Sequence, residues 1–249
     1  MRHNKKVAII MPAYNSESTL ESTINSIPKQ CVHEIILIND CSEDNTKKIA
    51  ADLHLTVLNH SNNRGYGAAQ KTGYSDAIAR SFNAVVLLHS DNQYDPSIVL
   101  KFVSKIIDEN FDVVTGTRML LGDVLSNGMP LWKYLPNRFL TCLENAVFKT
   151  KLTDYHNGYR AYSVNFLKSI PFLKLSDRFD FDTDIIIQAA IRNAKIAEIP
   201  HYTRYNKENS QMTFRSGIGY GLRILLTITK YIIHKTGLKY ESIFEKSKL

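Results

Sequence analysis

The sequence contains few cysteines, and they are not arranged to bind zinc or to form a disulfide framework. Cys31, Cys41 and Cys142 are scattered, and no CxxC or CxxH pair occurs. This pattern indicates a chain that folds in a reducing, cytoplasmic compartment. Glycine and proline are also scarce, with 11 and 7 residues among 249, which excludes collagen-like and low-complexity chains.

Long hydrophobic runs are absent as well. The apolar stretch near the N-terminus meets Pro12 and is too short for the core of a signal peptide. No run of about 18 uncharged apolar residues occurs, because the best candidate, residues 217–233, contains Arg223 and Lys230. We therefore expect neither a signal peptide nor a membrane-spanning helix.

Several ligand-binding motifs are missing. No GxGxxG sequence follows the first predicted strand, where Pro12 stands, and neither a Walker A motif nor a GxSxG motif occurs. These absences disfavour a NAD-dependent enzyme, an ATP-driven motor and an α/β-hydrolase. A nucleotidyltransferase is also disfavoured, because no glycine-rich loop bearing a lysine follows the first strand.

Positive charge is present in excess, but in one part of the chain only. The formal net charge is +7, with 31 basic and 24 acidic residues. Residues 1–200 carry 22 basic and 21 acidic groups, whereas residues 201–249 carry nine and three. The basic segment is rich in Leu and Ile and contains no nucleic-acid recognition motif, so we predict no nucleic-acid partner.

Short apolar runs alternate with helical patterns in the first half of the chain. Continuous apolar runs are typical of strands buried on both faces, and this alternation predicts an α/β fold with a mostly parallel sheet. We expect strands at 7–11, 34–39, 55–58, 84–89 and 113–117, and helices at 17–27, 45–53, 68–80 and 96–108. Ser16, Asp44 and Asp95 are the predicted helix caps.

The second half is more helical. Helices are predicted at 130–149, 182–193 and 217–235, and a strand at 196–205. The first of these helices carries aromatic residues that look exposed, namely Trp132, Tyr134, Phe139 and Phe148. The last carries one polar stripe of Arg223, Thr227, Lys230 and His234. Segments 130–149 and 217–235 either lie on a membrane surface or pack their apolar faces into the core, and the sequence favours neither alternative.

Four predicted strands end in polar or glycine-rich segments, at 12–15, 39–42, 60–67 and 89–96. Ligands of parallel sheets bind beyond the carboxyl ends of the strands, so these segments predict a binding crevice. Within it, Asp91, Gln93 and His89 alternate in a way that suits Mg²⁺ or Mn²⁺ bound together with a diphosphate. The alternative is that Asp91 merely caps the following helix.

Seven motifs in register resemble the family 2 glycosyltransferases of GT-A fold, closest to the polyprenyl- and dolichyl-phosphate sugar synthases. The resemblance covers about residues 5–235 and rests on VAIIMPAYNS (7–16), ILINDCSEDNT (36–46), NRGYGAAQKTG (63–73), LHSDNQYDP (88–96), GTR (116–118), TDYHNGYRAY (153–162) and FDFDTD (179–184), followed by EIP (198–200) and TRY (203–205). It implies a GT-A domain over 1–215, with a nucleotide-sugar half (1–118) and an acceptor half (119–215). A basic amphipathic helix and polar tail would follow at 216–249.

The resemblance implies an inverting, metal-dependent transfer from a nucleoside-diphosphate sugar to a polyprenyl or dolichyl phosphate. The implied nucleotide-sugar pocket comprises Pro12, Ala13, Tyr14, Asn15, Glu17, Asp40, Asn63, Gly65, Gln70, Ser90, Asp91 and Arg118. Asp91 would bind the metal beside Gln93 and His89. The implied catalytic residues are Asp91, Asp154, Arg160 and Asp182, and Arg118, Arg160 and Arg204 would contact the acceptor phosphate.

Two departures from the family pattern leave alternatives open. His89 stands where the family has the first Asp of its DxD motif, and Cys41 replaces a glycine. Alternatives are therefore a transferase to a glycan or lipid hydroxyl in cell-envelope polysaccharide synthesis, with Asp154 or Asp182 as general base, and a non-catalytic sugar-nucleotide-binding protein. We interpret His156 as a surface or core histidine. The expected location is the cytoplasm, at the inner membrane face if the basic helix binds lipid.

Overall fold

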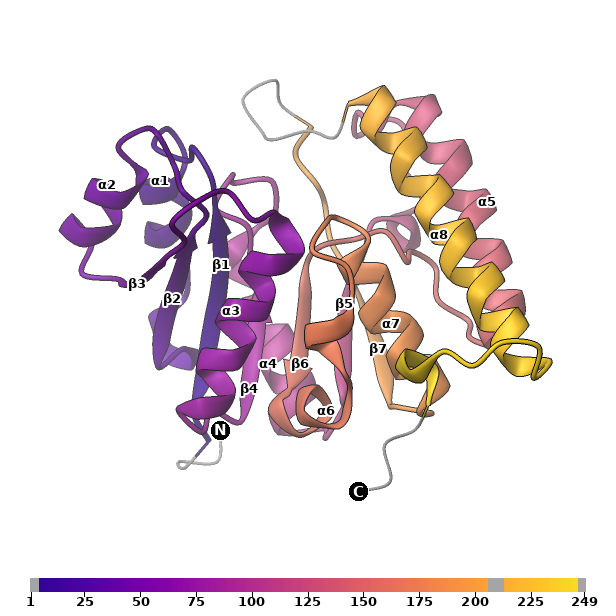
Figure 1. Cartoon of the computed structure of the whole chain (residues 1–249). Helices are drawn as coiled ribbons and strands as arrows, with labels where there is room; N and C mark the ends of the chain where they lie inside the picture. The colour runs from indigo at the N-terminus through magenta and orange to yellow at the C-terminus, as the bar shows by residue number, and fades with distance from the viewer. Residues whose placement is uncertain (1–4, 206–212, 246–249) are drawn as a thin grey trace.

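A seven-stranded sheet runs through the centre of the computed structural model, which describes residues 5–205 and 213–245 (Figure 1). The strand order is β3-β2-β1-β4-β6-β5-β7. Strand β6 is antiparallel to its neighbours β4 and β5, and the remaining pairs are parallel. The mostly parallel sheet predicted from the sequence is thus confirmed. The strands are β1 (Val7–Ala13), β2 (Glu34–Asn39), β3 (Thr56–Asn59), β4 (Ala84–Leu87), β5 (Val113–Thr117), β6 (Arg160–Ser163) and β7 (Ile196–Pro200).

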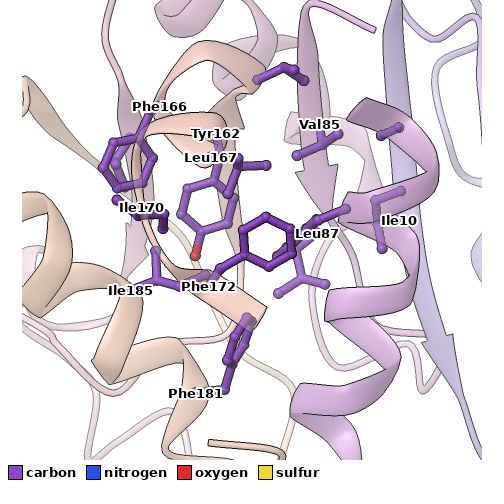
Figure 2. Close-up of a cluster of buried hydrophobic side chains, with 14 of the residues drawn as sticks. Ile10, Val85, Leu87, Tyr162, Phe166, Leu167, Ile170, Phe172, Phe181 and Ile185 are labelled. Carbon is purple, nitrogen blue, oxygen red and sulfur yellow. The ribbon is translucent and has the colours of Figure 1, made fainter. Parts of the chain in front are cut away.

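Helices cover both faces of this sheet. They are α1 (Leu20–Asn25), α2 (Thr46–Asp52), α3 (Tyr66–Ala79), α4 (Val99–Ile107), α5 (Leu131–Phe148), α6 (Val164–Ser169), α7 (Phe181–Ile191) and α8 (Phe214–Lys235). Successive strand residues point to opposite faces, so Ile10 packs with α3, α6 and α7, whereas Ile9 packs with α1, α2 and α4. Figure 2 shows the first of these two cores, which includes Phe181 and Ile185 of α7 and Leu87 of β4.

Some predicted boundaries differ from the structure. Strand β1 continues through Pro12, because β4 pairs with β1 only as far as Ile10 and leaves that edge open. Strand β4 ends at Leu87, so His89 lies in the following loop. Strand β6 and helix α6 were not predicted, since the short segment 160–163 begins with an arginine. Short 3₁₀ turns add Lys29–Cys31, Pro96–Ile98, Met119–Leu121, Phe172–Lys174 and Ser242–Phe244.

One of the three predicted helix caps is confirmed. The Asp95 carboxylate accepts the backbone N–H of Ser97 at 2.9 Å from the N-cap position. The Asp44 carboxylate accepts that of Thr46, also at 2.9 Å, but the N-cap residue of α2 is Asn45. Ser16 is not a side-chain cap, because α1 begins only at Leu20 and the Ser16 hydroxyl lies 2.8 Å from that of Ser90.

Helices α5 and α8 lie side by side at the end of the sheet nearest β7 (Figure 1). A small core of Leu140, Phe148, Ile187, Ile224, Ile228 and Phe244 joins them to α7. Phe148 is therefore buried, contrary to prediction, whereas Trp132 and Phe139 are exposed. Within residues 5–205 and 213–245, no helix is both long and apolar enough to cross a membrane. The division of the chain at residue 215 stays a prediction.

Candidate functional site

A cavity of about 750 Å³ opens where the carboxyl ends of β1, β2, β4 and β5 face α5 and α8. It contains most residues that the sequence singled out. Those lining it are Pro12, Ala13, Tyr14, Asp40, Asn63, Gly65, His89, Ser90, Asp91, Gln93, Arg118 and Asp182. The structure thus brings together side chains from four predicted strand ends and from the first turn of α7.

Two residues expected in the nucleotide pocket instead connect loops beside it. The side-chain oxygen of Asn15 accepts the backbone N–H of Glu43, and a carboxylate oxygen of Glu17 accepts that of Asn45, both at 2.9 Å. Neither Asn15 nor Glu17 lines the cavity. They hold the loop after β1 against the loop after β2 and so shape the wall that Pro12, Ala13 and Tyr14 form.

Asp40 is buried, and its carboxylate orders the glycine-rich loop. Its oxygens accept hydrogen bonds from the backbone N–H groups of Arg64 (2.9 Å) and Gly65 (2.8 Å), and one lies 2.6 Å from His60 Nδ1. A carboxylate offers about four acceptor positions. One position therefore remains for a ligand at the cavity wall, in the nucleotide-sugar pocket that the family resemblance implies.

The N-terminus of α3 does not offer its backbone to a ligand. The N–H groups of Gly67 and Ala68 both donate to the carbonyl oxygen of Asp177. Gly65 has a φ of 97°, and a Cβ atom there would lie 2.7 Å from the same oxygen. The glycines are therefore required for the close approach of the 176–178 loop and do not cradle a phosphate.

Asp154 is fully buried in an ion pair with Arg118. The two side chains are joined by bonds of 2.7 and 2.9 Å, and the Asn137 amide donates to the same carboxylate at 3.0 Å. Burial opposes ionisation, but Arg118 and Asn137 outweigh it, so the pKa of Asp154 lies well below its usual value. Asp154 also does not line the cavity, so it is not placed to act as the general base that the sequence analysis considered. The residue instead fixes Arg118, which reaches the cavity.

Arg160 does not contact the cavity either. Its guanidinium is fully buried and donates to the carbonyl oxygens of Asn157 (2.7 Å), Tyr155 (2.7 Å) and Asp182. These bonds join the 155–157 loop to the start of α7, so the predicted contact with an acceptor phosphate and the catalytic role are contradicted. Arg204 is exposed and donates to the side chain of Asn92 at 2.9 Å, outside the set of lining residues.

Asp182 lies at the cavity and is held by two hydrogen bonds. Its carboxylate accepts from the Tyr66 hydroxyl and from the Gln70 amide, both at 2.9 Å. Burial raises the pKa of Asp182 above its usual value, and Arg160 and these donors offset only part of that effect. Gln70, which was expected in the nucleotide pocket, is fully buried behind Asp182 and accepts from the Tyr74 hydroxyl.

The predicted metal residues lie together at the cavity, but they form no closed metal site. One oxygen of Asp91 accepts the backbone N–H of Gln93 at 3.1 Å. Within the described part of the chain, no group of three or more His, Cys, Asp or Glu side chains is placed to hold a metal ion. This donor set fits a cation that takes most of its ligands from a diphosphate and only one carboxylate from the protein.

His156 has partners that the sequence did not reveal. Its Nδ1 lies 2.9 Å from the Tyr220 hydroxyl of α8, and its Nε2 lies 3.2 Å from the fully buried carboxylate of Glu144 on α5. His156 and Tyr220 both line the cavity. This polar contact fixes α5 and α8 against the loop that carries Asp154, and no local pattern could have indicated it.

Helices α5 and α8 supply an apolar wall. Trp132, Phe139, Ile218, Leu222 and Leu225 line the cavity and are also exposed at the surface. Lys133, which the sequence analysis missed, lies beside Trp132 on the same wall, with its ammonium 5.1 Å from the Trp132 ring. Burial, and then the charge of Arg118, lower the pKa of Lys133. Two cations therefore share the part of the cavity that adjoins the apolar wall.

Comparisons with known proteins agree with this arrangement. Residues 8–170 match the family model described as glycosyl transferase family 2. The UDP-N-acetylglucosamine–dolichyl-phosphate N-acetylglucosaminyltransferase of Methanococcus voltae is 26% identical over 244 residues, covering 91% of this chain and 97% of the relative. The polyprenol monophosphomannose synthase of Mycolicibacterium smegmatis is 22% identical over 209 residues, covering 80% and 78%.

The fold also matches solved structures. Glucosyl-3-phosphoglycerate synthase from Mycobacterium tuberculosis, solved with Mn²⁺, UDP and glucosyl-3-phosphoglycerate, superposes with a TM-score of 0.71 at 20% identity, covering 91% of this chain and 80% of that one. The expected GT-A fold is thus confirmed. Since the family model spans well over half of the chain, this protein is a glycosyltransferase and belongs to glycosyl transferase family 2.

Proposed function

We propose that the protein transfers a sugar from a nucleoside diphosphate to a polyprenyl or dolichyl phosphate, with inversion at the anomeric carbon and with Mg²⁺ or Mn²⁺. One observation carries the proposal: an exposed apolar wall leads into the cavity and meets the cations Arg118 and Lys133. Such a surface suits an amphiphile with an anionic head. The Methanococcus voltae relative is named for a dolichyl-phosphate acceptor.

The donor would lie at the strand ends. Pro12, Ala13, Tyr14 and Asn63 would contact the nucleoside, and Asp91 would bind the cation that accompanies the diphosphate. When bound, the cation supplies Lewis-acid stabilisation of the charge on the leaving group. Asp91 is held ready by its bond from the Gln93 backbone, so little reorganisation is needed on binding.

The acceptor would enter from the α5–α8 side. Arg118 is fixed by Asp154, which neutralises one of the two cations, so the pair of cations retains one net positive charge for a phosphate. A phosphate is already anionic near neutral pH and needs no strong base. The residues of this chain would therefore act mainly by binding and orienting the two reactants.

A second candidate acceptor is a hydroxyl group of a glycan or lipid. It is favoured by Asp182, whose burial raises its pKa and so makes it a better proton acceptor at the cavity wall. An alcohol must lose a proton on attack, whereas a phosphate monoester has lost it already. The two candidates therefore differ in whether Asp182 is needed for proton transfer.

The test is a transfer assay with a panel of UDP- and GDP-sugars and Mn²⁺. The acceptors are a polyprenyl phosphate and the matching polyprenol, both in detergent. We expect transfer to the phosphate only, and its abolition by EDTA. Asp91→Asn should lower turnover at least about 100-fold. Lys133→Gln should raise the KM for the acceptor about tenfold, which is the loss of one charge-assisted hydrogen bond.

Lys101→Gln is the matched control, because it removes an exposed lysine from α4, away from the cavity. It should leave both constants unchanged. Transfer to the polyprenol rather than the phosphate would favour the hydroxyl candidate. Full turnover of Asp91→Asn, or transfer in the presence of EDTA, would refute the metal assignment.

A further inference from the structure

We infer that His89 acts through Tyr66 on Asp182, as part of one hydrogen-bonded chain, and that its Nε2 is not a ligand of the metal. This inference rests on the proposed function and deepens it. It assigns a positioning role to Tyr66, a residue that the sequence analysis passed over between two glycines. It also explains what an imidazole does at the position where the family motif has a carboxylate.

The three residues of this hydrogen-bonded chain come from three different parts of the fold. His89 follows β4, Tyr66 is the first residue of α3, and Asp182 lies in the first turn of α7. The Tyr66 hydroxyl lies 2.6 Å from His89 Nε2 and 2.9 Å from an Asp182 oxygen. All three side chains line the cavity. The phenol therefore bridges His89, two residues before Asp91, to the Asp182 carboxylate.

The number of protons excludes Nε2 of His89 as a metal ligand. The Tyr66 hydroxyl has one proton, and an ionised Asp182 can only accept it. His89 Nε2 must then carry a proton and donate it to the phenol oxygen. If Asp182 were protonated instead, the phenol would donate to Nε2. In both arrangements Nε2 is engaged with Tyr66, and a cation could reach only Nδ1.

Packing holds the chain in this geometry. A Cβ atom at Gly158 would lie 2.8 Å from His89 Nε2 and 3.1 Å from the Tyr66 hydroxyl. Only glycine therefore allows the backbone of residues 157–159 to lie so close to the hydrogen bond between His89 and Tyr66. Phe179 stacks on the Tyr66 ring, with centroids 5.2 Å apart. Gln70 holds the other oxygen of Asp182. The hydroxyl of Tyr66 is thus confined between its two partners.

The consequence is a link between two functional parts of the site. His89 lies two residues before Asp91, which would bind the cation of the donor diphosphate, and Asp182 is a carboxylate that lines the same cavity. Loss of the phenol hydroxyl would leave the His89 imidazole and the Asp182 carboxylate each short of a bond without touching Asp91. Turnover should therefore fall while cation and donor binding persist.

Tyr66→Phe and His89→Gln test this directly. Phenylalanine keeps the stacking on Phe179, and glutamine keeps an N–H donor for Tyr66 while removing the imidazole. Mn²⁺ affinity is measured by the EPR signal of free Mn²⁺ in the presence of UDP. We expect Tyr66→Phe to lower kcat about 10- to 100-fold, with donor KM and Mn²⁺ affinity within about twofold of wild type. His89→Gln should retain Mn²⁺ affinity and most of kcat. Tyr202→Phe, which removes an exposed hydroxyl, is the control.

A double variant completes the test. In the Tyr66→Phe background, His89→Ala should lower kcat by much less than it does in the wild type, because both changes break the same hydrogen-bonded chain. A loss of Mn²⁺ affinity of tenfold or more in His89→Gln, or an unchanged kcat in Tyr66→Phe, would overturn the inference. If the wild type transferred no sugar at all, the proposed function would fail. The Mn²⁺ measurement on His89→Ala, which leaves no donor atom in the side chain, would still decide whether His89 is a ligand.

Discussion

Burial raises the pKa of one carboxyl group near the site, that of Asp184. Asp184 lies in the first turn of α7, where it accepts the backbone N–H of Ser176 at 3.2 Å. Burial raises its pKa to about 7; the Ser176 bond and the charges of Lys71 and Lys230 oppose the rise, and Asp180 adds to it. The carboxyl therefore ionises near neutral pH in the folded protein, but near its ordinary pKa of 3.8 in the unfolded chain.

Asp184→Asn should stabilise the protein, and more so at high pH. Between about pH 4 and 7 the unfolded chain releases a proton that the folded protein retains, so the wild type loses stability as pH rises. Asparagine keeps an acceptor for Ser176 and removes this loss. A shift of three units would be worth about 4 kcal/mol, and partial solvent exposure reduces the expected gain to about 1–3 kcal/mol at pH 8. Urea unfolding at pH 5 and pH 8 measures it, and an equal gain at both values would contradict the assignment.

At the scale of elements, α8 is attached by a narrow apolar stripe. Ile224 and Ile228 are buried against α5 and α7, whereas Leu226 between them is 58% exposed. The polar stripe predicted for α8 does not face water freely: Arg223 donates to Asp180 at 2.7 Å, and His234 accepts the backbone N–H of Glu241. One side of α8 thus packs on the domain, and the other presents leucine and isoleucine.

Ile224→Ala should destabilise the protein by about 2–4 kcal/mol, because it opens a cavity in the small core that joins α8 to α5 and α7. Leu226→Ala is the matched control and should change stability by no more than about 0.5 kcal/mol. Urea unfolding followed by circular dichroism compares the two. Similar small effects for both variants would mean that α8 is not packed as the structure describes it.

The sheet could be predicted from the sequence, because strands buried on both faces are continuous apolar runs. Strand β6 could not be predicted, because it is short and begins with a charged residue, Arg160. The guanidinium of Arg160 can be buried only because it donates to backbone carbonyl groups, two nearby in the sequence and one, that of Asp182, 22 positions away. The same limit applies to the site. Many of the residues that line the cavity could be predicted, because they follow the ends of strands. That Asp154 is occupied in an ion pair could not be predicted, because its partner Arg118 lies 36 positions away in the sequence. Side-chain partners far along the chain leave no local pattern.

At the scale of the whole molecule, the surface of α5 and α8 is both apolar and basic. Its exposed apolar residues include Leu131, Leu135, Phe139, Leu222 and Leu226. The two helices contain six Lys and Arg residues and one acidic residue, Glu144, which is fully buried. This face continues into the cavity through Phe139 and Leu222. The sequence left two alternatives open for segments 130–149 and 217–235. We propose the membrane alternative, in which the molecule sits on anionic lipid with the cavity mouth at the membrane surface.

Leu135→Asp with Leu226→Asp should weaken this binding without altering the cavity, since both leucines are exposed and neither lines it. We expect the wild type to cosediment with vesicles containing phosphatidylglycerol, less so at high salt. The double variant should bind at least about tenfold more weakly, because two apolar side chains of about 1.5 kcal/mol or more no longer enter the interface. Leu173→Asp is the matched control, as Leu173 is 64% exposed and lies outside both helices. Equal binding by wild type and double variant would refute the membrane role, and an equal loss in the control would mean that the effect is not specific to this face.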